Sequence, residues 1–258
     1  MHRCKKNSKK SQITVFIILG LIILAGASFF IYQRSKITTK ETEVAEILET
    51  KIETLSIKTF VEECLEKTGR MAIAINSIQG GYFETPDPYF EYGFYKIPFY
   101  YLDGEFKNPT KEIIETELSK GIEKSIFDCI NLSHFTPYTI NFGNATVKTT
   151  IVNETTLFNL DFPVIIKKDN SETTISEFFV AIPSEINKAL IISKEVVEQH
   201  DEKNGIPLGF ITDLGYEEGV LFNVINMRTE VLYTIEFNSS VLKDQTYTFT
   251  FGVKYQLD

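Results

Sequence analysis

Few residues of this chain have types and spacings that could support catalysis or hold a metal ion. His134 and His200 stand alone, outside any HExxH motif, CxxC pair or EF-hand loop. No GxSxG elbow or Gly-rich phosphate loop occurs either. We therefore expect no enzyme activity, no metal site and no cofactor. Carboxylates that only folding brings together could still form a hydrolytic site.

Cysteine and asparagine offer more specific chemistry. Cys64 and Cys129 each lie late in a predicted helix and on the same side of a predicted membrane. We expect a disulfide between them, which antiparallel helices or a turn would permit; two buried free thiols are the alternative. Four Asn-X-Ser/Thr sequons are candidate glycosylation sites, at Asn131, Asn144, Asn153 and Asn238.

The apolar N-terminal run predicts where the protein resides. Residues 13–32 are uncharged, and as a helix they would span about 30 Å, the thickness of a hydrocarbon core. Four lysines precede the run, and acids soon follow it, so the positive-inside rule keeps residues 1–12 in the cytoplasm. The sequence predicts a single-pass protein of the cell membrane, held in the lipid bilayer by one helix, with its main domain extracytoplasmic.

Charge is divided unevenly along the 258 residues, whose formal net charge is −9. Residues 1–36 hold seven bases and no acid, which leaves 19 bases and 35 acids on the remainder. That remainder has a charge of −16 and repels phosphate. The sequence therefore predicts no nucleic-acid partner for the main domain.

The start of the apolar run carries a resemblance. Lys9-Lys10-Ser11-Gln12-Ile13-Thr14-Val15-Phe16 resembles the processing site of archaeal type IV pilin-like (class III) proteins. The resemblance implies a cut between Ser11 and Gln12 that leaves the helix in place. Such pilins usually carry Glu where this chain has Phe16, a departure that bears on filament assembly more than on anchoring. A signal-peptide cut after Ala27 and an uncut anchor are the alternatives.

Two further stretches extend the resemblance. Cys64-Leu65 and Gln79-Gly80-Gly81-Tyr82, together with the start of the apolar run, are similar to those of single-pass surface proteins of small-genome archaea. That group implies a surface location and no particular activity.

The predicted elements give an α+β fold. Apolar residues at helical spacing from about Thr39 predict a helical stalk over residues 33–81, packed on the globular part or on a neighbouring copy. A second helix opens at Asn108-Pro109, with Asn as the N-cap, and ends near Cys129. The rest of the 82–258 domain is mainly antiparallel, with one further helix after Ser184. Its strands are expected over residues 144–152, 156–168, 173–182, 219–227, 230–238 and 246–256.

An aromatic-rich segment separates the two predicted helices. Residues 82–106 contain 11 of the 33 aromatic residues and three prolines, which predicts a loop with one or two short strands. We expect most of its rings to be partly buried, because together they would form too large an apolar patch. An exposed minority is the candidate contact site, with the preference on Tyr92, Tyr95, Tyr100 and Tyr101.

These features favour a membrane-anchored extracytoplasmic surface protein. We expect a structural, adhesive or interaction role through a protein or glycan partner, with self-association through the stalk helix as a further option. A type IV pilin-like filament subunit is the first alternative, and an extracytoplasmic hydrolase is the alternative from another class.

Overall fold

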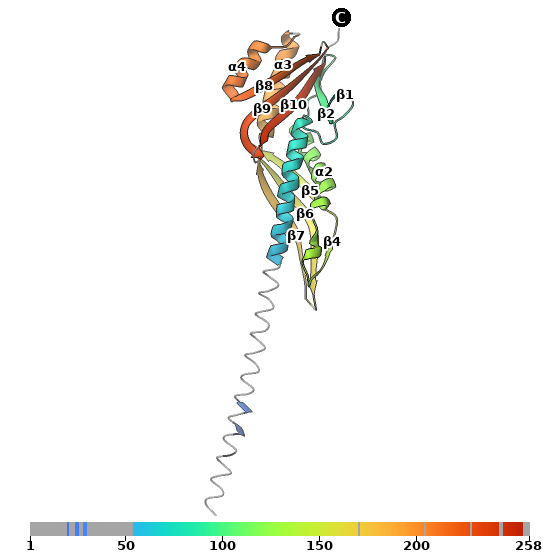
Figure 1. Ribbon diagram of the computed structural model, residues 1–258, viewed down its shortest axis with the longest axis vertical. Coiled ribbons are helices and arrows are strands. Elements are labelled where there is room, and N and C mark those ends of the chain that lie inside the picture. Colours follow the sequence, from blue (N-terminus) through green and yellow to red (C-terminus); the bar gives the residue numbers. More distant parts are fainter. Residues whose placement is uncertain are drawn as a thin grey trace, which may run out of the picture. The chain divides into compact units, whose positions relative to one another are not determined.

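A computed structural model (Figure 1) describes residues 54–169, 171–203, 205–227, 229–242 and 245–254, with Gly20, Leu24, Ala25, Ser28 and Phe29. The chain divides into two compact units, Met1–Leu55 and Ser56–Asp258. The predicted cut between Ser11 and Gln12, and most of the predicted membrane helix, lie outside the described residues. Within the described part, no helix is long and apolar enough to cross a membrane.

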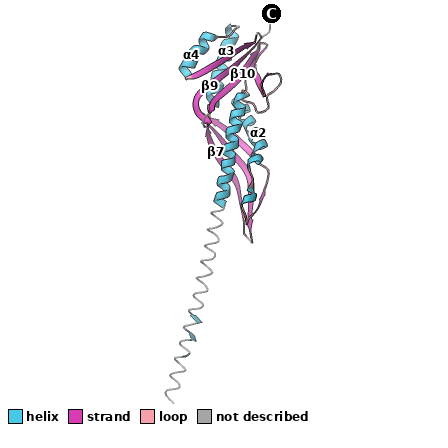
Figure 2. Cartoon of the chain, viewed as in Figure 1, coloured by secondary structure: helices cyan, strands magenta, loops and turns pink. Residues whose placement is uncertain are grey.

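The second unit is a mixed α+β structure in which four helices accompany two sheets among the described residues (Figure 2). This confirms the predicted fold class for that part of the chain. The helix over residues 54–78 belongs to this unit and is buried along one side, at Ile57, Val61, Leu65 and Ile73. This part of the predicted stalk therefore packs on the globular part, which is one of the two arrangements expected from the sequence.

The first sheet, the β4–β7 sheet, is built around β6 (Thr155–Lys168). β7 (Ser171–Pro183) pairs with one side of β6. On the other side, β5 (Thr146–Val152) pairs with the first half of β6 and β4 (Thr139–Phe142) pairs with its second half. Alternate residues of β5 and β6 are buried, because successive side chains of a strand point to opposite faces. Three of these strands match the sequence-based ranges closely, and β4 was not predicted.

The second sheet, the β8–β10 sheet, has the order β1-β2-β10-β9-β8, with β3 beside β2. Neighbouring strands are antiparallel except for β10 and β2, which are parallel. In β10, aromatic residues alternate with threonines, so the aromatic side chains lie on one face of the strand and the threonines on the other. The strand bounds are Tyr89–Tyr92 (β1), Tyr95–Leu102 (β2), Glu105–Phe106 (β3), Val220–Met227 (β8), Glu230–Leu242 (β9) and Gln245–Lys254 (β10).

The helix over residues 54–78 contacts both sheets. A Cβ on Gly69 would lie 2.8 Å from Ile182 of β7, so glycine is what allows the helix to approach that closely. Nearer its C-terminal end, the Ser77 hydroxyl donates to the Tyr247 hydroxyl of β10 at 2.6 Å. α3 (Ile186–Lys203) likewise contacts β5 and β10. One hydrophobic core therefore runs through both sheets.

The predicted disulfide is confirmed. Cys64 is bonded to Cys129, with their Cα atoms 5.6 Å apart, at the C-terminal end of α2 (Lys111–Cys129). The two helices are antiparallel, since Gly81, just past the first, lies against Ile114 near the start of the second. A covalent bond thus joins the two helices that flank the β4–β7 sheet.

Two details of the predicted helices are wrong. The N-cap of α2 is Thr110 rather than Asn108, and its hydroxyl accepts from Ile113 N. A helix beyond the single one predicted after Ser184 is also present, α4 (Leu208–Glu218). It contains Gly209 and Gly215, and each glycine is about 1 kcal/mol less favourable than Ala inside a helix. The amino-acid sequence of this segment therefore did not predict a helix.

Candidate functional site

The described residues contain no group of three or more His, Cys, Asp and Glu side chains placed to hold a metal ion. His134 is exposed in a short 3-10 helix (Leu132–His134). His200 lies in α3, and its side chain is outside the described part.

The tip of the β1–β2 hairpin carries three exposed aromatic rings. Tyr92 pairs with Tyr95, so only Gly93 and Phe94 form the loop. Gly93 has φ +63°, the conformation that the first residue of a type II′ turn requires. Phe94 is completely exposed, at 103 %, and Tyr92 and Tyr95 are 49 % and 38 % exposed. A regular turn therefore presents an apolar ring to solvent, where no contact within the described chain stabilises it.

The other two tyrosines chosen from the sequence lie elsewhere. Tyr100 is a correction: it is fully buried, stacks on Phe251 at 4.9 Å and donates its hydroxyl to Gly80 O at 3.0 Å. Its position inside β2 points the ring into the core. Tyr101 is half-buried and packs edge-on against Phe106 at 5.5 Å. Most rings of the segment are at least half-buried, as expected, and the exposed minority is Tyr92, Phe94, Tyr95 and Phe106.

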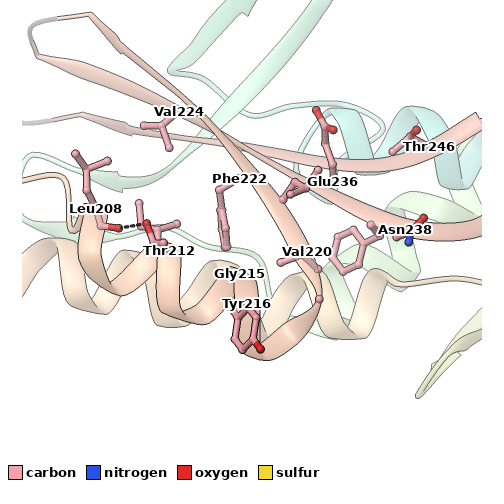
Figure 3. Close-up of a pocket in the computed structure, with 14 residues that line it drawn as sticks. Leu208, Thr212, Gly215, Tyr216, Val220, Phe222, Val224, Glu236, Asn238 and Thr246 are labelled. Carbon is pink, nitrogen blue, oxygen red and sulfur yellow. Dashed lines mark hydrogen bonds between the residues drawn. The ribbon is translucent and has the colours of Figure 1, made fainter.

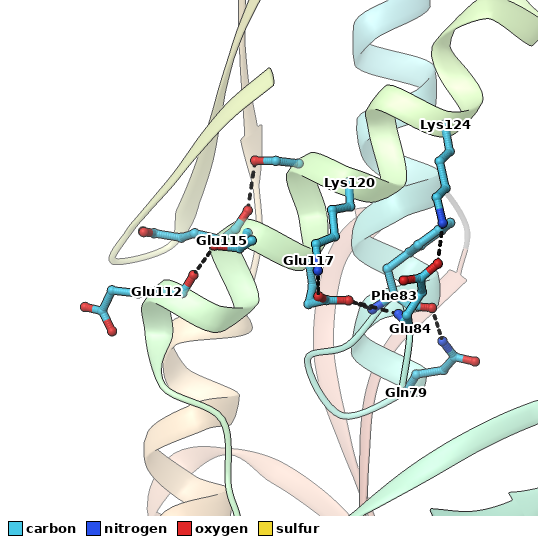
Figure 4. Close-up of polar contacts among 10 residues, drawn as sticks. Gln79, Phe83, Glu84, Glu112, Glu115, Glu117, Lys120 and Lys124 are labelled. Atoms are coloured by element: carbon cyan, nitrogen blue, oxygen red, sulfur yellow. Dashed lines mark hydrogen bonds and ion pairs between the residues drawn. The ribbon is translucent and has the colours of Figure 1, made fainter. Parts of the chain in front are cut away.

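A buried carboxylate holds the base of this hairpin. Glu117 of α2 accepts from the backbone N–H groups of Phe83 and Glu84 at 3.2 and 2.9 Å, and from Lys120 Nζ at 2.6 Å (Figure 4). Gln79 donates to two carbonyls of the same segment, and Lys124 pairs with Glu84. A buried carboxylate with several partners fixes its neighbours in place. The segment that precedes the hairpin is therefore tied to α2.

Ionisation states around that base follow from these contacts. The hydrogen bond from Lys124 lowers the pKa of Glu84, and the hydrogen bond to Glu117 raises the pKa of Lys120. Burial, and secondly the charge of Glu117, raises the pKa of Tyr82. Each shift favours the state present at neutral pH, namely charged for Glu84 and Lys120 and neutral for Tyr82.

α2 also covers the outer edge of β5. Three acceptors spaced four residues apart on one helix face receive the alternate backbone N–H groups of the strand. Glu123 accepts from Val147 at 2.7 Å, Ser119 from Thr149 at 3.1 Å and Glu115 from Ile151 at 2.8 Å. The helix thus supplies the hydrogen bonds of a missing neighbour strand.

A groove opens where α4 meets β8 (Figure 3). Only Gly219, in the left-handed conformation at φ +66°, separates the helix from the strand. A Cβ on Gly215 would lie 3.0 Å from Val220 O, so the two elements approach closely there. The groove has a volume of about 1230 Å³, and its lining includes Leu208, Thr212, Tyr216, Phe222, Val224 and Glu236.

The groove is apolar and accessible. Leu208, Tyr216 and Leu221 are 62 %, 92 % and 71 % exposed, although each is a large apolar or aromatic residue. Phe222 points from β8 toward Gly215 of α4 (Figure 3). The sequence did not predict this groove for two reasons. One of its walls is α4, a helix that was not predicted, and the other is β8, whose position at the edge of the sheet is known only from the topology.

The four sequon asparagines are all exposed, at Asn131, Asn144, Asn153 and Asn238. Asn131 caps the short 3-10 helix through its carbonyl oxygen, which accepts from Ser133 N, so its amide nitrogen is free of that bond. Asn153 lies in the turn between β5 and β6, and Asn238 lines the groove. Each position is accessible to modification; whether any is used stays a prediction.

Comparison of the chain with protein-family models, with curated proteins and with solved structures gives no match.

Proposed function

We propose that this chain is a membrane-anchored extracytoplasmic interaction protein that contacts a partner through the tip of its β1–β2 hairpin. The observation that carries the proposal is the complete exposure of Phe94 between Tyr92 and Tyr95. Exposed aromatic rings are enriched where proteins bind one another, because a ring buries a large area at a small cost in conformational entropy.

The rigidity of the hairpin supports this role. A two-residue loop leaves little freedom at the tip, and Glu117 holds the preceding segment to α2. Binding therefore does not require the rings to be ordered first, which would weaken affinity.

Chain connectivity and oxidation support the extracytoplasmic part of the proposal. The hairpin follows the C-terminal end of a helix of about 25 residues, so it lies roughly 36 Å along that helix from residue 54. The anchor predicted over residues 13–32 comes before this helix in the sequence. The Cys64–Cys129 disulfide fits an oxidising compartment, and the acidic character of the domain keeps it soluble there.

The first experiment addresses location. The full chain is expressed in cells, and protease is added from outside. We expect the domain to be removed from intact cells. Cleavage that occurs only after lysis would overturn the proposed orientation.

The second experiment addresses the hairpin. Cells that display the full chain are compared with cells that display the Tyr92→Ser, Phe94→Ser, Tyr95→Ser variant for attachment to protein-coated surfaces. Phe179→Ser is the matched control, because Phe179 is 49 % exposed on β7, as exposed as Tyr92. We expect at least a tenfold loss of attachment for the hairpin variant alone, with its melting temperature nearly unchanged.

Equal attachment of the hairpin variant and the wild type would contradict the proposal. A third outcome is that wild-type cells attach only to glycan-coated surfaces and cells with the hairpin variant do not. The hairpin would then still be the binding site, but its partner would be a carbohydrate, since aromatic rings also stack on sugars.

A further inference from the structure

Among the described residues, two long strands pair on one side only, β7 with β6 and β8 with β9. The edge of β7 carries Glu172, Glu177 and Pro183, and its Phe179 N–H donates to Glu62, whereas β8 has no comparable protection. β8 has eight residues, which at about 3.3 Å each make an edge of roughly 26 Å, and it pairs only with β9. At the other side of the same sheet, the strands β1 and β3 have four and two residues. Free N–H and C=O groups along an edge attract another strand, so proteins usually shorten, charge or cover such edges.

None of those devices protects β8. Its described residues include no Lys, Arg, Asp, Glu or Pro, and Leu221, Asn223 and Met227 are exposed. α4 packs beside β8 but leaves the groove open between them. The edge is thus bordered by an apolar trough that can receive side chains.

The charge of the elements around the groove is mainly negative. α4, β8, β9 and β10 carry five acids and a single base, Lys254. Lys254 pairs with Glu230 at 3.0 Å, and Glu218 pairs with Lys188 at 3.1 Å. In the part of the chain that the structure describes, no ion pair includes the other three acids, Asp213, Glu217 and Glu236. Glu236 lines the groove, and the other two lie on α4 beside lining residues.

We propose that an extended basic peptide segment of a partner protein binds by adding a strand to the free edge of β8. Its backbone pairs with β8, and alternate apolar side chains enter the groove between Leu208, Tyr216 and Phe222. Basic side chains of the segment face Glu236 and the acids of α4. Main-chain pairing supplies affinity, and the groove and its charge supply specificity. This site is separate from the hairpin of the proposed function.

The probe for the test is a synthetic nine-residue peptide in which Lys and Val alternate. It is titrated against the full-length chain in detergent micelles, and its fluorescence anisotropy is followed. We expect saturable binding that weakens at least fivefold between about 50 and 500 mM salt, because exposed charges are screened. The same peptide with Glu in place of Lys should not bind.

Backbone methylation distinguishes strand addition from general adhesion. Alternate amides of an extended strand point to opposite edges, so only one edge of the peptide faces β8. One peptide carries N-methyl groups on its Val residues, and the other carries them on its Lys residues. We expect one of the two to lose at least tenfold in affinity and the other to bind normally. Loss in both peptides, or in neither, would overturn strand addition.

Matched threonine variants locate the site. Thr212→Arg places bulk and positive charge in the groove, and it should reduce affinity at least tenfold. Thr116→Arg on α2 is the control, because the Thr212 and Thr116 hydroxyls each donate to the carbonyl four residues earlier, both at 2.8 Å. Both threonines are exposed, so both variants should fold. Equal binding by the two variants would place the peptide elsewhere and overturn the assignment.

Hydrogen exchange identifies the occupant of the edge. The amides of residues 220–227 should gain protection when the peptide is added. Protection that instead rises with protein concentration, without peptide, would assign the edge to a second copy of the chain and overturn the proposal.

Discussion

The outer edges of β5 and β8 meet solvent in opposite ways. At β5, a helix places Glu115, Ser119 and Glu123 against alternate backbone N–H groups, and the strand ends up buried at those positions. At β8, the adjacent helix approaches closely near Gly215, and a groove opens between the two elements. The same chain therefore covers one edge with specific acceptors and leaves another free of them, and the proposed strand addition rests on that contrast.

The largest effect should come from uncovering β5. Replacing Glu115, Ser119 and Glu123 together with Ala leaves the N–H groups of three buried residues without acceptors, at about 1–3 kcal/mol each. We expect the free energy of unfolding, measured by urea titration with circular dichroism, to fall by about 3–9 kcal/mol. Asp128→Ala, an exposed acid on the same helix, should cost less than 0.5 kcal/mol.

A loss below about 1 kcal/mol in the triple variant would show that water replaces the three side chains at no cost. The covered edge of β5 would then contribute no more to the free energy of unfolding than the open edge of β8, and the contrast between the two edges would be contradicted.

The second largest effect concerns the bond that joins the two flanking helices of the β4–β7 sheet. Cys64 and Cys129 are 65 residues apart in sequence, so removing the disulfide by Cys→Ser replacement at both positions should cost about 4 kcal/mol through the freedom it returns to the unfolded chain. Dithiothreitol should lower the unfolding midpoint of the wild type toward that of the variant and leave the variant unchanged. A wild-type midpoint that does not respond to reductant would contradict this.

Sequence reasoning succeeded where a local pattern determines local structure. A strand was predicted over residues 246–256 from their Thr, Phe and Tyr content, and β10 (Gln245–Lys254) occupies most of that range. Cys64 and Cys129 were paired because both were predicted to lie late in helices on one side of a predicted membrane. In the structure Cys129 ends α2, whereas Cys64 lies well inside the helix over residues 54–78. The structure adds the antiparallel packing that brings them together.

The failures arise where the chain's topology decides. Tyr100 belongs to the same aromatic run as Tyr92, but it lies on the inner face of β2 because β2 pairs with β10 deep in the sheet. The three acceptors of α2 that cover β5 are visible in the sequence as Glu115, Ser119 and Glu123, which recur every four residues beside the apolar stripe. The sequence contains no pattern that would place β5 against these three residues.

The smallest effect should be found on the open edge itself, where two neighbouring residues of β8 provide the comparison. Val220 is 5 % exposed and faces the core, whereas Leu221 is 71 % exposed and points to the other face. Val220→Thr puts a hydroxyl into the core at nearly constant volume and should cost about 1–3 kcal/mol. Leu221→Thr removes a larger apolar side chain, yet it should change the free energy of unfolding by less than 0.5 kcal/mol, because that side chain is already in water. Urea titration of the two variants side by side measures the difference. If Leu221→Thr costs as much as Val220→Thr, another part of the chain covers Leu221, and the edge of β8 is not open.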